Sequence, residues 1–90
     1  MAETIKGLER IFKALANRRR LAIIKFLKIN NEASVGQTAH AIKLSFRSTS
    51  KHLNILVAAE MLEKEQRGLQ MYYRLRESPP DGMRAILSLV

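Results

Sequence analysis

The stretch Ser45-Phe46-Arg47-Ser48-Thr49-Ser50-Lys51-His52-Leu53-Asn54-Ile55-Leu56 carries the pattern that decides the fold. The stretch predicts a helix. Its inner face consists of Phe46, Thr49, Leu53 and Leu56, which are spaced at i, i+3, i+7 and i+10. The hydroxyl of Ser45 is a candidate N-cap, because it can accept a hydrogen bond from a free backbone N–H. The opposite face consists of Arg47, Ser48, Lys51 and Asn54, which supply two long cations, a hydroxyl and an amide. No acidic residue follows before Glu60. Such a face suits phosphates and base edges, although a solvated amphipathic helix could carry the same residues.

Composition limits the chain to one small domain and favours a polyanionic partner. Its 90 residues, of which 47% are hydrophobic, suffice for one core of three or four helices. Sixteen Lys and Arg against eight Asp and Glu give a net charge of +8, which favours nucleic acid over an anionic membrane. No apolar run is long enough to cross a membrane, and the N-terminus does not resemble a signal peptide. The lack of cysteine excludes disulfides and thiolate metal sites and fits a reducing cytoplasm.

Two helices are predicted before the deciding stretch. The first covers residues 4–16, with Thr4 as N-cap and an apolar stripe formed by Ile5, Leu8, Ile11, Phe12 and Leu15. The second, from Arg18 to about Ile29, is capped by Asn17 and ended by Asn30-Asn31. It is apolar nearly all round, which predicts a central helix buried on several sides. The triplet Arg18-Arg19-Arg20 could contact phosphates, but such residues more often pair with acids or with the end of the preceding helix.

A third, short helix precedes the deciding stretch. Ser34 and Gln37 have the spacing of a capping box. The helix ends near Ile42, and Lys43-Leu44 forms the turn into the next helix. The inner face expected for the third helix consists of Val35, Thr38, Ala39 and Ile42. Two short helices with a tight turn predict a helix-turn-helix over about residues 34–59.

The segment that follows predicts a β-hairpin. Residues 69–76 alternate strictly, as in a half-buried strand, with Leu69, Met71, Tyr73 and Leu75 on the apolar, buried side and Gln70, Tyr72, Arg74 and Arg76 on the other. Gly68 supplies the turn from residues 62–66, so Arg67 lies at the tip of a wing over about residues 61–76. After a break at residues 78–82, a final helix over about residues 80–90 places Met83, Ile86, Leu87 and Val90 on one face. The predicted fold is mainly α with a small β-hairpin: one winged helix-turn-helix domain over residues 1–90, with four to five helices and a two-stranded wing.

Three groups of residues carry a resemblance to a known family. They are Leu15-Ala16-Asn17 with Arg20-Leu21, Leu44-Ser45 with Ser50, His52-Leu53 and Leu56, and Gly68 with Tyr72-Tyr73-Arg74-Leu75. In order and spacing they resemble the ArsR (arsenical-resistance repressor) family of winged-helix regulators, over roughly residues 8–76. The resemblance implies a DNA-binding repressor whose recognition helix is the deciding stretch.

The chain departs from that family at several positions. Ser34 and Gly36 stand where metal sensors of the family often have a Cys-x-Cys pair, and the final helix has no histidine. His40 and His52 lie on different helices without a ligand partner, so no metal or other cofactor is expected. Glu60 replaces a common glycine, so either it is left-handed, at a cost of about 1 kcal/mol, or the helix runs on. Phe46 replaces a usually polar residue; we expect it in the core, with a contact to a thymine methyl group as the alternative.

We therefore expect a sequence-specific, DNA-binding transcriptional regulator and not an enzyme. Arg47 and Lys51 are the best candidates for reading base edges, since long cations pair with guanine acceptors. Serines of the recognition helix would hold phosphates or bases, and Arg67 would insert at the wing. The full set expected to contact double-stranded DNA is Ser45, Phe46, Arg47, Ser48, Ser50, Lys51, His52, Arg67, Gln70 and Tyr72.

A homodimer is expected to form through the first and last helices, over about residues 4–16 and 80–90. Its interface would consist of Ile5, Leu8, Phe12, Met83, Ile86, Leu87 and Val90. Such a dimer predicts a palindromic operator and repression by occluding a promoter, in a prokaryotic cytoplasm where the protein associates with the nucleoid. The alternatives are a nonspecific nucleic-acid-binding protein and a winged-helix module that binds a protein. The sequence identifies no small-molecule effector.

Overall fold

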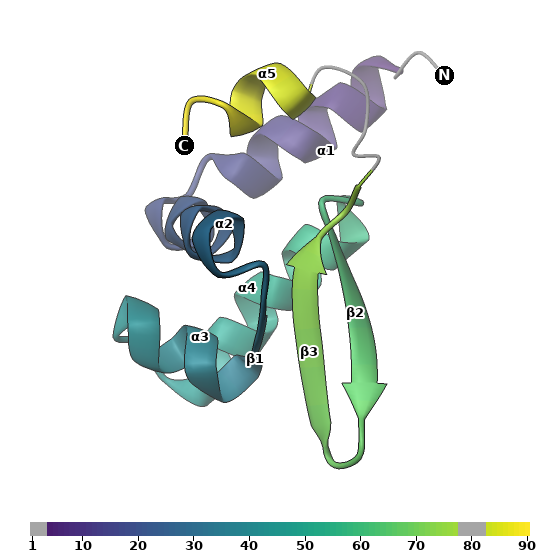
Figure 1. Cartoon of the computed structure of the whole chain (residues 1–90). Coiled ribbons are helices and arrows are strands. Elements are labelled where there is room, and N and C mark those ends of the chain that lie inside the picture. The colour runs from purple at the N-terminus through teal and green to yellow at the C-terminus, as the bar shows by residue number, and fades with distance from the viewer. Residues whose placement is uncertain (1–3, 78–82) are drawn as a thin grey trace.

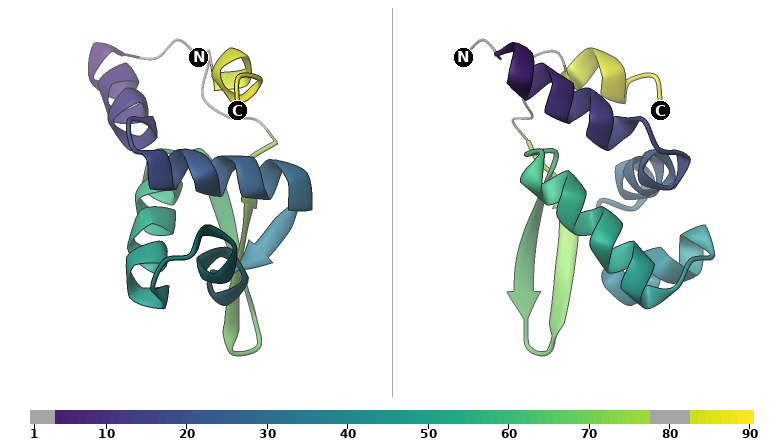
Figure 2. Two further views of the ribbon diagram at one scale, coloured as in Figure 1. Left: turned by 90° about the vertical axis from the view of Figure 1, so that its left-hand side faces the viewer. Right: turned by 180° about the vertical axis from the view of Figure 1, so that it is seen from behind.

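The computed structural model describes residues 4–77 and 83–90. In these residues the elements follow one another as α1 (Ile5–Leu15), α2 (Arg18–Asn30), β1 (Glu32–Ser34), α3 (Val35–Ile42), α4 (Phe46–Ala58), β2 (Leu62–Arg67), β3 (Gln70–Leu75) and α5 (Met83–Leu87) (Figure 1). The left-hand view of Figure 2 shows α2 running across the molecule, with α1 and α5 above it and α3, α4 and the hairpin below. This arrangement is the winged helix-turn-helix that the sequence predicts.

Four helices begin at the polar residues expected to cap them. The hydroxyls of Thr4 and Ser45 accept hydrogen bonds of 3.0 and 3.1 Å from the backbone N–H three residues on. The Asn17 side chain accepts from two backbone N–H groups at the start of α2. Ser34 and Gln37 form both bonds of a capping box. Because each cap satisfies backbone donors that the helix itself leaves free, these residues fix where α1, α2, α3 and α4 begin.

The sheet has three strands, one more than the predicted hairpin. β1 pairs antiparallel with β3, with Ala33 opposite Tyr73, and β2 pairs with the other edge of β3. β1 is only three residues long, and its last residue, Ser34, also caps α3. So short a segment shows no recognisable alternation in sequence. The strand joins the helix-turn-helix to the base of the wing.

The hydrophobic core lies where α1, α2, α4 and the start of the hairpin meet. Its most deeply buried large side chains are Ile23, Ile24, Leu27, Leu53, Leu56, Met61 and Leu62. α2 packs against α1, α3, α4, β1 and β3, as expected of a central helix. It is not buried all round, since Ile29 is 70% exposed and Leu21 also reaches the surface.

The two ends of α4 settle two questions that the sequence left open. The favoured placement of Phe46 in the core is wrong, because its side chain is 64% exposed. As the first residue of α4, it lies beyond the core that Thr49 and Leu53 enter. At the other end, α4 stops at Ala58, and Glu60 adopts the left-handed conformation with φ of 62°. The helix therefore does not run on through Glu60.

The last helix is shorter than predicted, since α5 covers only Met83–Leu87. Residues 78–82, where the chain break and the start of this helix were predicted, lie outside the described residues, as does the side chain of Met83. Ile86, Leu87 and Val90 pack partly against the core of their own chain. The Lys28 ammonium of α2 donates a 2.9 Å hydrogen bond to the Leu87 carbonyl. The apolar stripe of α5 is therefore partly covered within the monomer.

Candidate nucleic-acid interface

The N-terminal end of α4 presents exposed cations and hydroxyls at the lower end of the molecule. Arg47, Ser48 and Lys51 are exposed there, together with the cap residue Ser45. Within residues 4–77 and 83–90, neither Arg47 nor Lys51 forms an ion pair. The positive end of the helix dipole lies at the same place. This end of α4 can therefore offer charge and hydrogen-bond donors to an anionic ligand without first breaking contacts within the chain.

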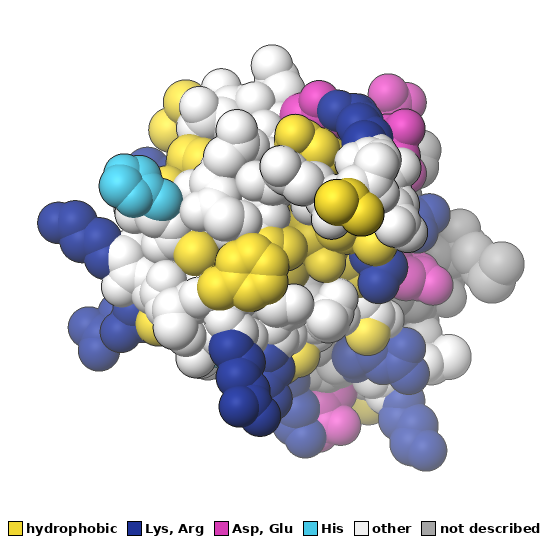
Figure 3. All heavy atoms as spheres, turned by 90° about the horizontal axis from the view of Figure 1, so that it is seen from below, with side chains coloured by type: hydrophobic (Ala, Val, Ile, Leu, Met, Phe, Trp, Pro, Cys, Tyr) yellow, Lys and Arg dark blue, Asp and Glu magenta, His cyan; other side chains and the backbone are white. Residues whose placement is uncertain are grey.

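The face of the molecule that includes this end is basic with an apolar centre. Figure 3 shows it from below, with Lys and Arg side chains around much of the periphery and hydrophobic side chains gathered near the middle. Acidic side chains lie on the right half of the view. The tip of the wing also projects to this side (Figure 1). A helix end and a wing that share one basic face form the arrangement with which winged-helix proteins contact a duplex.

The structure places His52 differently from the other predicted contact residues of α4. Its ring is half-buried, and its Nδ1 lies 3.1 Å from Nη1 of Arg20. Arg20 also donates to the carbonyls of Ala14 and Lys13 at the end of α1. Burial first, and then the positive charge of Arg20, lower the pKa of His52. A neutral ring can accept a hydrogen bond from the guanidinium, so His52 fastens α4 to the junction of α1 and α2.

The same contacts answer the question left open for the arginine triplet. Arg20 binds the end of the preceding helix, which is the more common of the two expected roles. Arg18 and Arg19 remain exposed on α2. They line a hollow of about 550 Å³ between α2 and α3, which has an apolar floor that includes Phe26.

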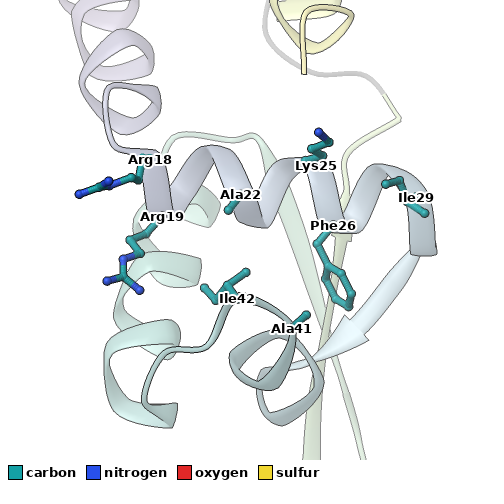
Figure 4. A pocket seen from close by; sticks show the side chains of 8 residues that line it. All are labelled: Arg18, Arg19, Ala22, Lys25, Phe26, Ile29, Ala41 and Ile42. Atoms are coloured by element: carbon teal, nitrogen blue, oxygen red, sulfur yellow. The ribbon is translucent and has the colours of Figure 1, made fainter.

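That hollow lacks converging polar groups. Figure 4 shows Phe26 pointing down toward α3, while Arg18 points away to the left and Lys25 points up from α2. A site for a small molecule needs a few polar groups aimed into an apolar cavity. Arg18 and Lys25 point away from the hollow, and Arg19, which points down from α2, does not by itself make a converging set. The described residues also contain no cluster of three or more His, Cys, Asp or Glu side chains that could hold a metal ion.

The arginines of the wing are held by acidic residues. Both Nη atoms of Arg67 donate to the Glu32 carboxylate of β1 at 2.8 Å, and Nη2 also donates to Glu65 at 3.0 Å. The guanidinium lies 4.8 Å from the centre of the Tyr72 ring, which is within the range of a cation–π contact. Arg74 contacts Glu65 at 3.1 Å and a second acid, Glu63, at 3.3 Å.

These ion pairs change the role expected for Arg67. Hydrogen bonds from Arg67 lower the pKa of Glu32 and of Glu65, and the two carboxylates raise the pKa of Arg67. Arg67 therefore fastens the wing to β1, which differs from the free, inserting cation predicted from the sequence. The tip itself consists of Gly68, with φ of 61°, and Leu69, which is fully exposed. The prediction that Leu69 belongs to the buried side of the hairpin is wrong, because Leu69 lies in the turn before β3 begins.

A cleft of about 630 Å³ separates the start of α4 from the wing. It brings together three of the predicted contact residues, Phe46, Ser50 and Gln70. It also includes Lys64 and Leu69, which sequence reasoning did not select. Lys64 precedes Glu65 in a strand of mixed charge, so no pattern distinguished it from a solvated residue. Tyr72 is not in this cleft, because its ring lies under Arg67.

Comparison with known proteins identifies the family. The family model described as "Bacterial regulatory protein, arsR family" matches residues 17–64, which include all of α2, β1, α3 and α4. The chain belongs to this family. The arsenical resistance operon repressor of Bacillus subtilis is 30% identical over 82 residues, or 91% of this chain and 78% of that repressor. The transcriptional repressor SdpR of the same organism is 35% identical over 65 residues, or 72% of this chain and 71% of SdpR.

Solved structures of other bacterial proteins share the fold. The homodimeric winged helix-turn-helix domain of a Mycobacterium bovis protein matches with a TM-score of 0.79 and 28% identity, over 94% of this chain and 75% of that one. HlyU from Vibrio cholerae matches with the same TM-score and identity, over 99% of this chain and 92% of HlyU. This arsR-family protein is thus a DNA-binding transcriptional regulator of the winged-helix type. None of the helices in its described residues has the length and apolar content needed to span a membrane.

Proposed function

We propose that this arsR-family protein is a homodimeric repressor that reads a palindromic operator mainly through the N-terminal half of α4. The observation that carries the proposal is the exposed, unpaired state of Arg47 and Lys51 within the described chain, at the positive end of the helix. Either side chain can donate to the O6 and N7 acceptors of guanine in the major groove. Ser45, Ser48 and Ser50 would bind phosphates or neighbouring bases. The wing would contact the adjacent backbone with Gln70 and Lys64.

The apolar face of α1 supports the homodimer. Ile5 is 87% exposed and Phe12 is 55% exposed, and both line an apolar hollow along α1 together with Leu8. Exposed apolar stripes of this kind usually mark an interface in a soluble protein. The M. bovis domain that shares this fold is homodimeric. We assign the larger share of the interface to α1, since Ile86, Leu87 and Val90 already pack partly on their own core.

Selection of binding sites from random duplexes tests the repressor directly. A twofold dimer predicts a palindrome whose half-sites are roughly 34–36 Å apart, or about one turn of DNA. Enrichment of such a palindrome is the expected result. Binding without enrichment would favour a nonspecific architectural protein, and no binding to any duplex would favour a module that recognises another protein. Placing the selected palindrome over a promoter in a transcription assay then tests repression, which predicts fewer transcripts as protein is added.

The salt dependence of binding tests how the complex is held. If the dimer neutralises about six to ten phosphates, the slope of log K against log[salt] should lie between roughly −5 and −9. The measurement is a titration of labelled operator by fluorescence anisotropy at several salt concentrations. A slope near zero would contradict the assignment of the basic face to DNA.

Phe12→Asp tests the dimer, because it places a charge in the middle of the exposed stripe of α1. We expect a monomer at tens of micromolar by light scattering, with loss of operator binding and an unchanged circular dichroism spectrum. Lys6→Asp is the control, since Lys6 lies on α1 outside the apolar hollow. This variant should remain a dimer. A wild-type protein that is already monomeric, or a Phe12→Asp variant that stays dimeric, would contradict this interface.

A further inference from the structure

We propose that Phe46 and Leu69 form an apolar contact surface for thymine-containing duplex DNA, in which Phe46 packs against the 5-methyl group of a thymine in the major groove. The inference rests on the proposed function, and it names a specificity determinant that charge alone does not supply. It starts from an unusual feature, because two large apolar side chains are exposed next to a lysine in one cleft.

The two side chains share one hollow, although they are 23 residues apart in sequence. Phe46 is the first residue of α4, and Leu69 lies in the turn of the wing. Both line the cleft between α4 and the hairpin, whose floor includes Val35 and Met71. Figure 3 shows hydrophobic side chains gathered near the middle of this face, with Lys and Arg around them. The surface is therefore continuous with the proposed DNA interface.

The core does not explain why Phe46 is apolar. Thr49, one turn later, is fully buried, while Phe46 is mostly exposed. A polar residue at this position would lose little burial and would avoid exposing an aromatic ring to water. An exposed apolar patch surrounded by polar residues commonly marks a binding site. Phe46 is also next to Arg47, so the same turn of helix presents an apolar ring and a long cation together.

The charges around the hollow determine which partner fits. Lys64 lines it, Arg47 follows Phe46 directly, and no acidic residue is part of the lining. The partner is therefore anionic with small apolar groups on its surface. In the major groove of DNA the thymine methyl is the one apolar group that a base presents. Leu69, at the tip of the wing, faces the adjacent backbone, where it would contact deoxyribose without distinguishing bases.

Uracil substitution tests this contact, because it removes only the methyl group of a thymine. Each thymine of the selected operator is replaced in turn by uracil, and affinity is measured by fluorescence anisotropy. For the wild-type protein we expect a loss of roughly threefold to tenfold at one position in each half-site, as the burial of one methyl group predicts. With Phe46→Ala, uracil at that position should have no further effect. Phe46→Leu, which keeps an apolar side chain, should retain part of the preference.

Leu69→Ala is the matched control, since it shortens the other exposed side chain of the same hollow. We expect it to weaken binding to thymine-containing and uracil-containing operators by the same factor, so the effect of uracil remains. Circular dichroism and thermal unfolding check that each variant folds. If Phe46→Ala does not fold, the comparison of Phe46→Leu with Phe46→Gln replaces it.

Three results would overturn the inference, and each differs from a failure of the proposed function. Specific operator binding with no response to uracil at any thymine would show that no methyl group is read. A methyl preference that survives in Phe46→Ala would assign the reading to another residue. A change in oligomeric state on Phe46→Ala, seen by light scattering, would make the patch a contact between protein chains. Failure of the wild-type protein to select any sequence would instead contradict the proposed repressor.

Discussion

Within residues 4–77 and 83–90, the two cations at the start of α4 are free, whereas the two arginines within the strands of the wing are paired with acids. Arg47 and Lys51 are exposed without an acidic partner in the described part of the chain, whereas Arg67 and Arg74 are held by Glu32, Glu63 and Glu65. The formal charge of +8 therefore overstates what the wing can offer to DNA. The two segments therefore differ in the cost of moving an arginine onto a phosphate.

Strand register brings acidic residues next to the arginines of the wing. Glu63 lies directly opposite Arg74 across the hairpin, and Glu32 of β1 lies on the other side of Arg74, although its carboxylate accepts hydrogen bonds from Arg67. Cross-strand neighbours of opposite charge stabilise each other in this way. Around Arg47 the residues four positions away are both lysine: Lys43, in the turn before α4, and Lys51 on α4, so no acid lies at that spacing.

The largest expected effect that bears on this comparison is that of Arg47→Ala. Loss of a bidentate base contact should cost about 1–3 kcal/mol on the selected operator, or roughly 5-fold to 150-fold in affinity. Preference at one base pair should relax, while binding to random DNA should fall much less. Arg10→Ala, which removes an exposed cation from α1, is the charge-matched control and should affect both duplexes slightly and equally. If Arg47→Ala lowered both affinities alike, the base-reading residue would lie elsewhere.

Glu65→Gln tests the same comparison on the wing. Its expected effect on DNA binding is smaller than that of Arg47→Ala. Neutralising the carboxylate that binds both Arg67 and Arg74 should free positive charge near the duplex. Since exposed ion pairs contribute little, we expect binding to all sequences to tighten by only a few-fold. The salt dependence should become steeper by about one unit. Glu60→Gln, just beyond the C-terminal end of α4, makes the same change of charge away from the wing tip and outside the α1 hollow, and it should alter neither quantity.

Arg67→Ala complements that experiment. Because its guanidinium already contacts two carboxylates, its removal should weaken cognate and random duplexes evenly and by only a few-fold. Competition of each duplex for labelled operator measures both affinities. A selective loss on the cognate site would show that Arg67 leaves Glu32 to read bases, as the sequence alone suggested.

The sequence predicted those features whose causes lie within a few residues. Thr4, Asn17, Ser34 and Ser45 each cap a helix by bonding to backbone two or three residues away. Glu32, which binds Arg67, is 35 residues away on a strand too short to recognise from the sequence. The ion pair between β1 and the wing could therefore not be predicted from neighbouring residues. Helical periodicity described the inner face of α4 but could not indicate where the core ends, and for this reason Phe46 was placed inside it.

The smallest expected effect is a difference in how the two regions respond to pH. Burial and nearby cations lower the pKa of His52 below its ordinary value of 6.5. The unfolded chain therefore takes up a proton before the folded chain as the pH falls. The free energy of unfolding should be constant above about pH 7, decrease as the pH falls through 6.5, and level off below the folded pKa. Glu32 of β1 and Glu65 of the wing have a pKa below 4.5. Their contribution to the free energy of unfolding is therefore present above that pH and is lost only at lower pH.

Thermal unfolding at low ionic strength and fixed protein concentration, measured from pH 8 to pH 3, separates the two windows. His52→Gln should flatten the profile between pH 7 and pH 5 and leave the acidic decline, whereas Glu32→Gln should reduce the acidic decline and leave the neutral one. His40→Gln, which removes the exposed histidine of α3, should keep both. A neutral decline that persists in His52→Gln would assign that decline to another group and would contradict a lowered pKa of His52 in the folded chain.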